Sequence, residues 1–105
     1  MSPADRIAAA VPLATELREL VLREADRGLG AAWNNRLVQL LDILRTDDDP
    51  AEVLTYAALT FDKLYQGPRN FGEFMIYRPD QPAQIAANEH RLRLTGELRD
   101  LLHGA

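Results

Sequence analysis

The sequence predicts an all-α protein: a compact four-helix bundle with an irregular aromatic loop or short helix between its third and fourth helices. Three observations lead to this prediction. Apolar residues recur with the spacing of one helix face in four stretches of the chain. Prolines and capping residues stand where several of these stretches begin. Residues 65–78 break the period, and a single strand there would have no partner strand.

The first helix is predicted to begin at Ser2, a capping residue followed by proline, and Asp5 can complete a capping box. Its apolar stripe consists of Ile7, Ala10, Leu13, Ala14, Leu17, Leu20 and Val21. Pro12 lies within this stripe, so we expect a kink or a helix restart near it. Gly28 and Gly30 are expected to end the helix, one of them in a left-handed cap.

The second and third helices are predicted over 31–45 and 50–65. The core stripe of the second helix is Trp33, Leu37, Leu40, Leu41 and Leu44. The broader apolar face of the third is Val53, Leu54, Ala57, Ala58, Phe61, Leu64 and Tyr65. Gly67 and Pro68 then stop the third helix, because proline cannot continue it.

Three adjacent aspartates, 47–49, separate these two helices and raise the question of a calcium loop. An EF-hand loop needs glycine at its sixth position and glutamate at its twelfth, where this chain has Glu52 and Ala58. A second capping box over 49–52, with proline at the first helical position, explains the residues better. We therefore expect no metal here.

The last helix is predicted from 82 or 83 to 102 and carries two apolar faces. One face consists of Ala87, Leu94, Leu98, Leu101 and Leu102. Ile85 and Leu92 lie nearly opposite, so we expect a second surface to touch the helix, either the segment 65–78 or a partner chain. Gly96 lowers helix stability relative to alanine, which suggests a close approach by another backbone.

The composition is that of an ordinary soluble domain. The chain of 105 residues is expected to form one helical domain over 1–105. Apolar residues make up 47% and charged residues 27%. The absence of cysteine excludes disulfides and a cysteine nucleophile, and it favours a reducing, cytoplasmic location. Neither a signal peptide nor an apolar run of about 20 residues is visible, so we expect no membrane partner.

The charged and titratable residues form no catalytic constellation. His90 and His103 lie about 20 Å apart on one helix, too far to share a metal. We interpret His90 as solvated and His103 as a favourable partner for the helix dipole. There is no glycine-rich phosphate loop, so we expect no cofactor, no metal and no catalytic residue. The formal net charge of −4 argues against nucleic acid and is compatible with a basic protein partner.

The segment 65–78 is the candidate working surface, because it concentrates aromatic residues in a part of the chain that no helix explains. The candidate partner-binding residues are Tyr65, Arg69, Asn70, Phe71, Glu73 and Tyr77. Asn70 can also hold the turn through an Asx-type bond. Glu73, flanked by Phe71 and Phe74, can be partly buried beside Arg69 or Arg78, or it can cap the backbone of its own loop.

Half of the chain resembles a family of small bacterial helical domains of unknown function. The family signature reads aromatic-Gly-Gly-Met-Gly-Ser-Phe-Asn-Asp, then three aliphatic residues and, farther on, an Asn that opens a Leu-rich last helix. The counterparts here are residues 65–76 and Asn88; Gln66 and Arg69 replace two glycines, Asn70 the serine and Glu73 the aspartate. The resemblance implies an all-helical fold with a mid-chain loop and no catalytic role. In size and charge the chain is also similar to bacterial toxin-immunity proteins.

Three hypotheses for the function follow. The first is a non-catalytic protein-interaction module, in its most concrete form an immunity or antitoxin-type protein that binds a toxin through 65–78. The second is a homodimeric structural protein that buries Ile85 and Leu92 against a second copy. The third is a small-molecule binder or enzyme that uses Glu73 in a pocket under Phe71 and Phe74. We lean towards a protein without catalytic activity.

Overall fold

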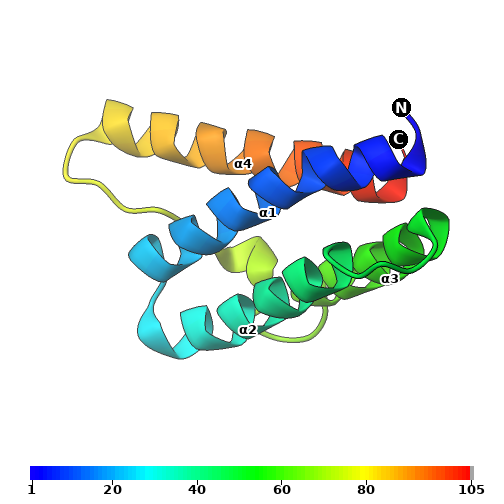
Figure 1. The fold of residues 1–105 in the computed structure, drawn as a ribbon. Coiled ribbons are helices and arrows are strands. Elements are labelled where there is room, and N and C mark those ends of the chain that lie inside the picture. Colours follow the sequence, from blue (N-terminus) through cyan, green and yellow to red (C-terminus); the bar gives the residue numbers. More distant parts are fainter. Residues whose placement is uncertain (105) are drawn as a thin grey trace.

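The computed structural model describes residues 1–104, the side chain of Arg27 excepted, and all regular secondary structure in this part of the chain is helical (Figure 1). The elements are α1 (Pro3–Glu24), α2 (Arg27–Leu44), α3 (Pro50–Asp62), η1 (Lys63–Tyr65), η2 (Phe71–Glu73) and α4 (Gln81–His103). No strand occurs among these residues. The all-α, four-helix prediction is therefore confirmed, and the interruption between the last two helices contains two short 3-10 turns, η1 and η2.

The four long helices pack in a simple order. Helix α1 contacts both α2 and α4, while α3 contacts α2, α4 and, less extensively, α1. Figure 1 shows α1 crossing between α4 and the α2–α3 pair, with the two ends of the described chain close together. Arg6 joins these ends, because its guanidinium donates to the carbonyl oxygens of Leu101 (2.8 Å) and Leu102 (3.1 Å). The last turn of α4 thus has partners for its free carbonyl groups.

Helix starts follow the capping chemistry that the sequence predicts. Ser2 and Asp5 form the predicted reciprocal capping box at the start of α1. The Asp49 side chain accepts a bond from the Glu52 backbone N–H (3.3 Å) at the start of α3, which is the Asp49 half of the predicted second box. Helix α4 begins slightly earlier than predicted, because Asp80 accepts from the Ala83 N–H (3.0 Å) and makes Gln81 the first helical residue.

The predicted end of the first helix is wrong. Helix α1 ends at Glu24, and both Gly28 and Gly30 lie inside α2 rather than at a helix end. Ala25 is extended and separates the two helices. A Cβ on Gly30 would lie 3.1 Å from the Ala25 Cβ, so this glycine allows the tight corner without any left-handed cap.

Two other details differ from what the sequence suggests. Of the kink or restart expected near Pro12, the restart is wrong, because α1 is continuous through this proline, which lies on the exposed side of the helix. The second is Gly96, where a Cβ would meet nothing within 4 Å, so no backbone approaches it closely. No physical reason for a glycine at this position is visible in the fold.

The core is one continuous cluster drawn from all four helices and from the segment after α3. Its largest fully buried side chains are Phe61, Phe71, Leu17, Leu37, Leu40, Ile76, Leu98 and Val21. Leu94, Leu98 and Leu102 supply the inner face of α4, as predicted. Ile85 and Leu92, on the predicted second face, remain exposed in this chain. The second face is therefore not covered by residues 65–78.

Candidate functional site

The turn that follows α3 is held by Asn70. Its amide group donates to the Gly67 carbonyl (2.9 Å), and its side-chain oxygen accepts from the Gly72 N–H (2.8 Å). The Asx-type bond predicted from the sequence is therefore confirmed. Gly67 and Arg69 both have positive φ, 78° and 54°. A Cβ on Gly72 would lie 2.9 Å from the Asn70 side-chain oxygen, so the same bond requires glycine there.

An aromatic cluster forms the inner side of this segment. The Phe71 ring meets Trp33 edge-on at 5.3 Å between centroids and Tyr65 at 5.7 Å. The Phe74 ring lies 5.5 Å from Trp33 and 5.5 Å from Phe71. Phe71 is 1% and Phe74 2% exposed, so both rings belong to the core. The geometry is that of stabilising aromatic pairs.

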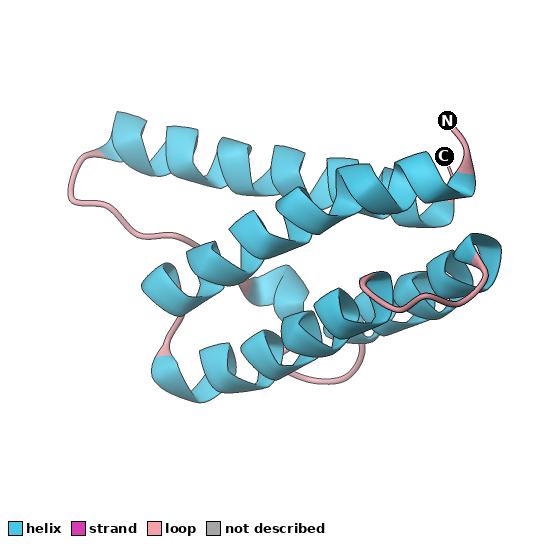
Figure 2. Ribbon diagram, in the orientation of Figure 1, coloured by secondary structure: helices cyan, strands magenta, loops and turns pink. Residues whose placement is uncertain are grey.

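Residues 74–77 form an extended run in which inward and outward side chains alternate. Phe74 and Ile76 are buried, whereas Met75 and Tyr77 are 44% and 76% exposed. This period of two is that of a strand, although the run has no partner strand. Figure 2 shows it as part of the loop that leads to α4. The run is therefore the irregular segment that the sequence predicts between the third and fourth helices, and it is neither a strand nor a helical turn.

The side chain of Asn88 replaces the missing strand. Its oxygen accepts from the Ile76 N–H (3.0 Å), and its amide group donates to the Ile76 carbonyl (2.9 Å) and to the Gln84 carbonyl (2.9 Å). The Gln84 side chain accepts from the Arg78 N–H (3.0 Å). Two amide side chains of α4 therefore satisfy backbone groups that a β-ladder would otherwise pair.

Arg78 fastens the far end of the segment to α1. Its two terminal nitrogens lie 2.7 and 2.8 Å from the two carboxylate oxygens of Glu24, a bidentate ion pair. These bonds to Arg78 lower the pKa of Glu24 below its ordinary value, against the opposing effect of burial. The predicted pairing of Arg78 with Glu73 is wrong, because Glu24 takes its guanidinium group.

The six predicted partner-binding residues occupy three different environments. Phe71 lies in the core, and Asn70 and Tyr65 are half-buried. Arg69, Glu73 and Tyr77 are exposed. Of the two alternatives for Glu73, partial burial is wrong, because this side chain is exposed whereas that of Phe71, in the same turn η2, is buried. Glu73 and Phe74 line a common cleft, described next, whereas the buried Phe71 is not part of its lining, and the small-molecule hypothesis stays a prediction.

A cleft with an acidic rim lies beside this segment, at the corner where α1 turns into α2. It encloses about 440 Å³ and is lined by Glu24, Ala25, Asp26, Leu29, Trp33, Glu73, Phe74, Met75 and Tyr77. Three carboxylates therefore surround an apolar floor. Two of the predicted residues, Glu73 and Tyr77, meet in this cleft. The contribution of the α1–α2 corner could not be predicted, because it depends on how the helices pack.

A second set of charges lies where α4 passes over the aromatic cluster. The Arg91 guanidinium carbon is 5.7 Å from the centre of the Phe74 ring, and that of Arg99 is 4.9 Å from the Tyr65 ring. Burial raises the pKa of Tyr65, although the charges of Arg99 and Arg91 oppose this change. Burial also lowers the pKa of Arg91. The tyrosine is therefore protonated at neutral pH and can donate a hydrogen bond.

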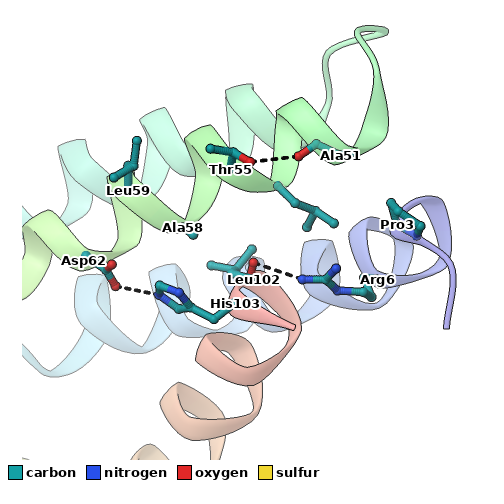
Figure 3. A pocket seen from close by; sticks show the side chains of 10 residues that line it. Pro3, Arg6, Ala51, Thr55, Ala58, Leu59, Asp62, Leu102 and His103 are labelled. Atoms are coloured by element: carbon teal, nitrogen blue, oxygen red, sulfur yellow. Dashed lines mark hydrogen bonds and ion pairs between the residues drawn. The ribbon is translucent and has the colours of Figure 1, made fainter. Parts of the chain in front are cut away.

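Both histidines pair with carboxylates of other helices. His90 is exposed, as its interpretation as a solvated residue requires, and it lies 3.0 Å from Glu16 of α1. His103 lies 2.8 Å from Asp62 of α3, at the edge of a cavity of about 420 Å³ near the chain ends (Figure 3). The one hydroxyl in its lining, that of Thr55, donates to the Ala51 carbonyl (3.1 Å) of its own helix. This histidine and aspartate therefore lack a nucleophile beside them.

A groove between α2 and α3, of about 550 Å³, exposes Tyr56 and Leu59. The sequence pattern assigned neither residue to a site.

Within residues 1–104, no three histidine or acidic side chains gather closely enough to bind a metal ion. In the same part of the chain, every helix is too short or too polar to cross a membrane.

No protein-family model, curated protein or solved structure matches this chain. The resemblance of residues 65–76 to a family of small bacterial domains therefore stays a prediction. The function has to be argued from the geometry described above.

Proposed function

We propose that the protein is a non-catalytic protein-interaction module that binds a basic segment of another protein in the acid-rimmed cleft. Its most concrete form is a bacterial immunity or antitoxin-type protein that occupies a basic toxin. The observation that carries the proposal is the exposure of Tyr77 and Met75 at the edge of this cleft, on a backbone that is fastened from its other side.

The charge of the cleft favours a basic partner. Arg78 neutralises Glu24, but no ion pair to Glu73 or Asp26 occurs among the described side chains. Two carboxylates thus remain at the rim. The formal net charge of −4 adds a long-range attraction for a cationic protein. Lysine or arginine side chains of the partner would pair with the rim, while their neighbours cover the apolar floor.

The exposed side chains are of the kind that anchors interfaces. Tyrosine combines a large apolar ring with a polar tip and is enriched among residues that dominate binding energy. Methionine adapts its shape to irregular surfaces. Because Asn88 and Gln84 already hold the backbone of 76–78, little conformational entropy is lost when a partner binds.

The experiment is a capture from the source organism, with the product of the neighbouring gene tested as a purified partner. Tyr77→Ala and Glu73→Gln should each weaken binding at least about tenfold, the range of an interface hot spot. Tyr56→Ala is the matched control, because Tyr56 is also exposed (62%, against 76% for Tyr77) but lies in the α2–α3 groove.

Two further readouts decide the proposal. Binding should weaken as salt rises, because the recognition is between opposite charges. In the immunity form, the captured partner loses its toxic activity in the complex. Equal affinity of Tyr77→Ala, Tyr56→Ala and the wild type for every partner found would exclude the cleft as the binding surface.

The homodimer is a second candidate, which the exposure of Ile85 and Leu92 on α4 favours. Both side chains lie away from the core, where a second copy of α4 can cover them. Sedimentation at micromolar concentration tests this candidate, and a monomer there excludes it. The two candidates use different faces, so one chain can support both.

A further inference from the structure

Arg91 is a buried cation that has no acidic partner among the described residues. It is 8% exposed on the inner face of α4. Its Nε donates to the Asn88 side-chain oxygen (3.3 Å), and its guanidinium lies over the Phe74 ring. The ion pairs of residues 1–104 do not include it. Burying a charge is unfavourable unless an opposite charge compensates, and an aromatic ring compensates only in part.

Arg99 lies about two turns farther along α4 and, unlike Arg91, is exposed to solvent. Its guanidinium lies over the rings of Tyr65 (4.9 Å) and Phe61 (5.6 Å), again without a carboxylate partner in the described chain. Residues 91 and 99 share one face of the helix, with Thr95 between them. The Thr95 hydroxyl already donates within α4, towards the Arg91 and Leu92 carbonyls, both at 3.1 Å. Burial raises the pKa of the Tyr65 hydroxyl, and the positive charges of Arg99 and Arg91 both act in the opposite direction.

We propose that Arg91, Arg99 and the Tyr65 hydroxyl form a binding site for an oxyanion, a phosphate or carboxylate group carried by a small molecule. Guanidinium groups bind such anions through paired N–H donors in a planar fork. The aromatic rings hold both arginines in place before the anion arrives. The net negative charge of the chain disfavours a polyanion and leaves a small ligand. This site is separate from the acid-rimmed cleft and does not depend on the proposed function.

The probe is inorganic phosphate, added at constant ionic strength by replacing sodium chloride, with the thermal unfolding midpoint as the readout. The midpoint of the wild type should rise and saturate, because an anion that binds only the folded state stabilises it by mass action. Arg91→Met and Arg99→Met should each lose this saturable part, with at least a tenfold weaker apparent affinity. Arg93→Met is the matched control, because Arg93 is exposed on the same helix.

Phosphate also stabilises proteins without binding, but that effect does not saturate and is the same in all variants. An acetate series distinguishes the two ligand chemistries: a stronger saturable shift with acetate assigns the site to a carboxylate, and a stronger one with phosphate assigns it to a phosphate. Arg91→Lys keeps the positive charge but loses the paired N–H donors of the guanidinium group. This variant replaces Arg91→Met in the experiment if Arg91→Met does not fold, and its affinity for the anion should also fall. A wild type that shows no saturable shift with either anion, or variants that keep the full shift, would overturn the proposal.

Discussion

Residues 71–78 have an inward side and an outward side, and the two differ in almost every respect. Phe71, Phe74 and Ile76 fill the core, whereas Met75 and Tyr77 are exposed. Both sets come from one short backbone that alternates between them. The inward residues attach the segment to the core. The outward residues lie on the same backbone, so this attachment also fixes their positions. The comparison teaches that exposed side chains can be held on a fixed backbone by contacts made on its opposite side.

The largest expected effect is on the inward side. Phe71→Ala should lower the free energy of unfolding by about 3–5 kcal/mol, because it leaves a cavity in the buried aromatic cluster. Tyr77→Ala should change it by no more than about 0.5 kcal/mol, as for other exposed positions. Urea unfolding of the two variants measures both values. Similar losses for the two would mean that the division into an inward and an outward side is wrong.

A smaller loss of stability is expected where hydrogen bonds attach the segment to α4. Asn88→Ala leaves the N–H and C=O of Ile76 without partners and should cost about 1–3 kcal/mol. It should also weaken partner binding, because Met75 and Tyr77 lose their fixed backbone. Glu89→Ala, one residue away and exposed, is the control. Amide hydrogen exchange at Ile76 reports the change directly, and an unchanged rate there would count against the role given to Asn88.

Local sequence signals predicted most of the fold. The four helices and the caps at Ser2 and Asp49 depend on neighbouring residues, so a single chain is enough to find them. The error at Gly28 and Gly30 has the same origin. Glycine is usual at helix ends but is also used where two backbones approach, and only the packed corner at Ala25 distinguishes these cases.

The candidate site was predicted only in part, for a physical reason. A concentration of aromatic residues is expected both in a core and in an interface, so the pattern could not show that Phe71 faces inwards while Tyr77 faces outwards. The pairing of Arg78 with Glu24 joins residues 54 positions apart. Such pairs depend on how helices pack, which no local period records. The acid rim of the cleft was missed for this reason, although its carboxylates are plain in the sequence.

The smallest effect is expected at the ion pair that ends the segment. Because the pKa of Glu24 is lowered in the folded protein, its pairing stabilises the fold at pH values above its ordinary pKa of 4.5. That stability is lost as the pH falls from 4.5 through the lower pKa of the folded state. Glu24→Gln should therefore lower stability at neutral pH by less than Asn88→Ala does, and it should remove part of the loss on acidification.

Unfolding measured from pH 7 to pH 3 tests this prediction, with Arg78→Met as the second arm. Both variants should show the same flattened acid dependence, because either change removes the same pair, and the double variant should add little to it. Acidification should loosen the backbone near Arg78 first. Amide hydrogen exchange should therefore become faster at Arg78 before it does at Phe71. If acid instead released the core residues first, the ion pair would belong to the attachment of the whole segment, and the two sides would unfold as one unit.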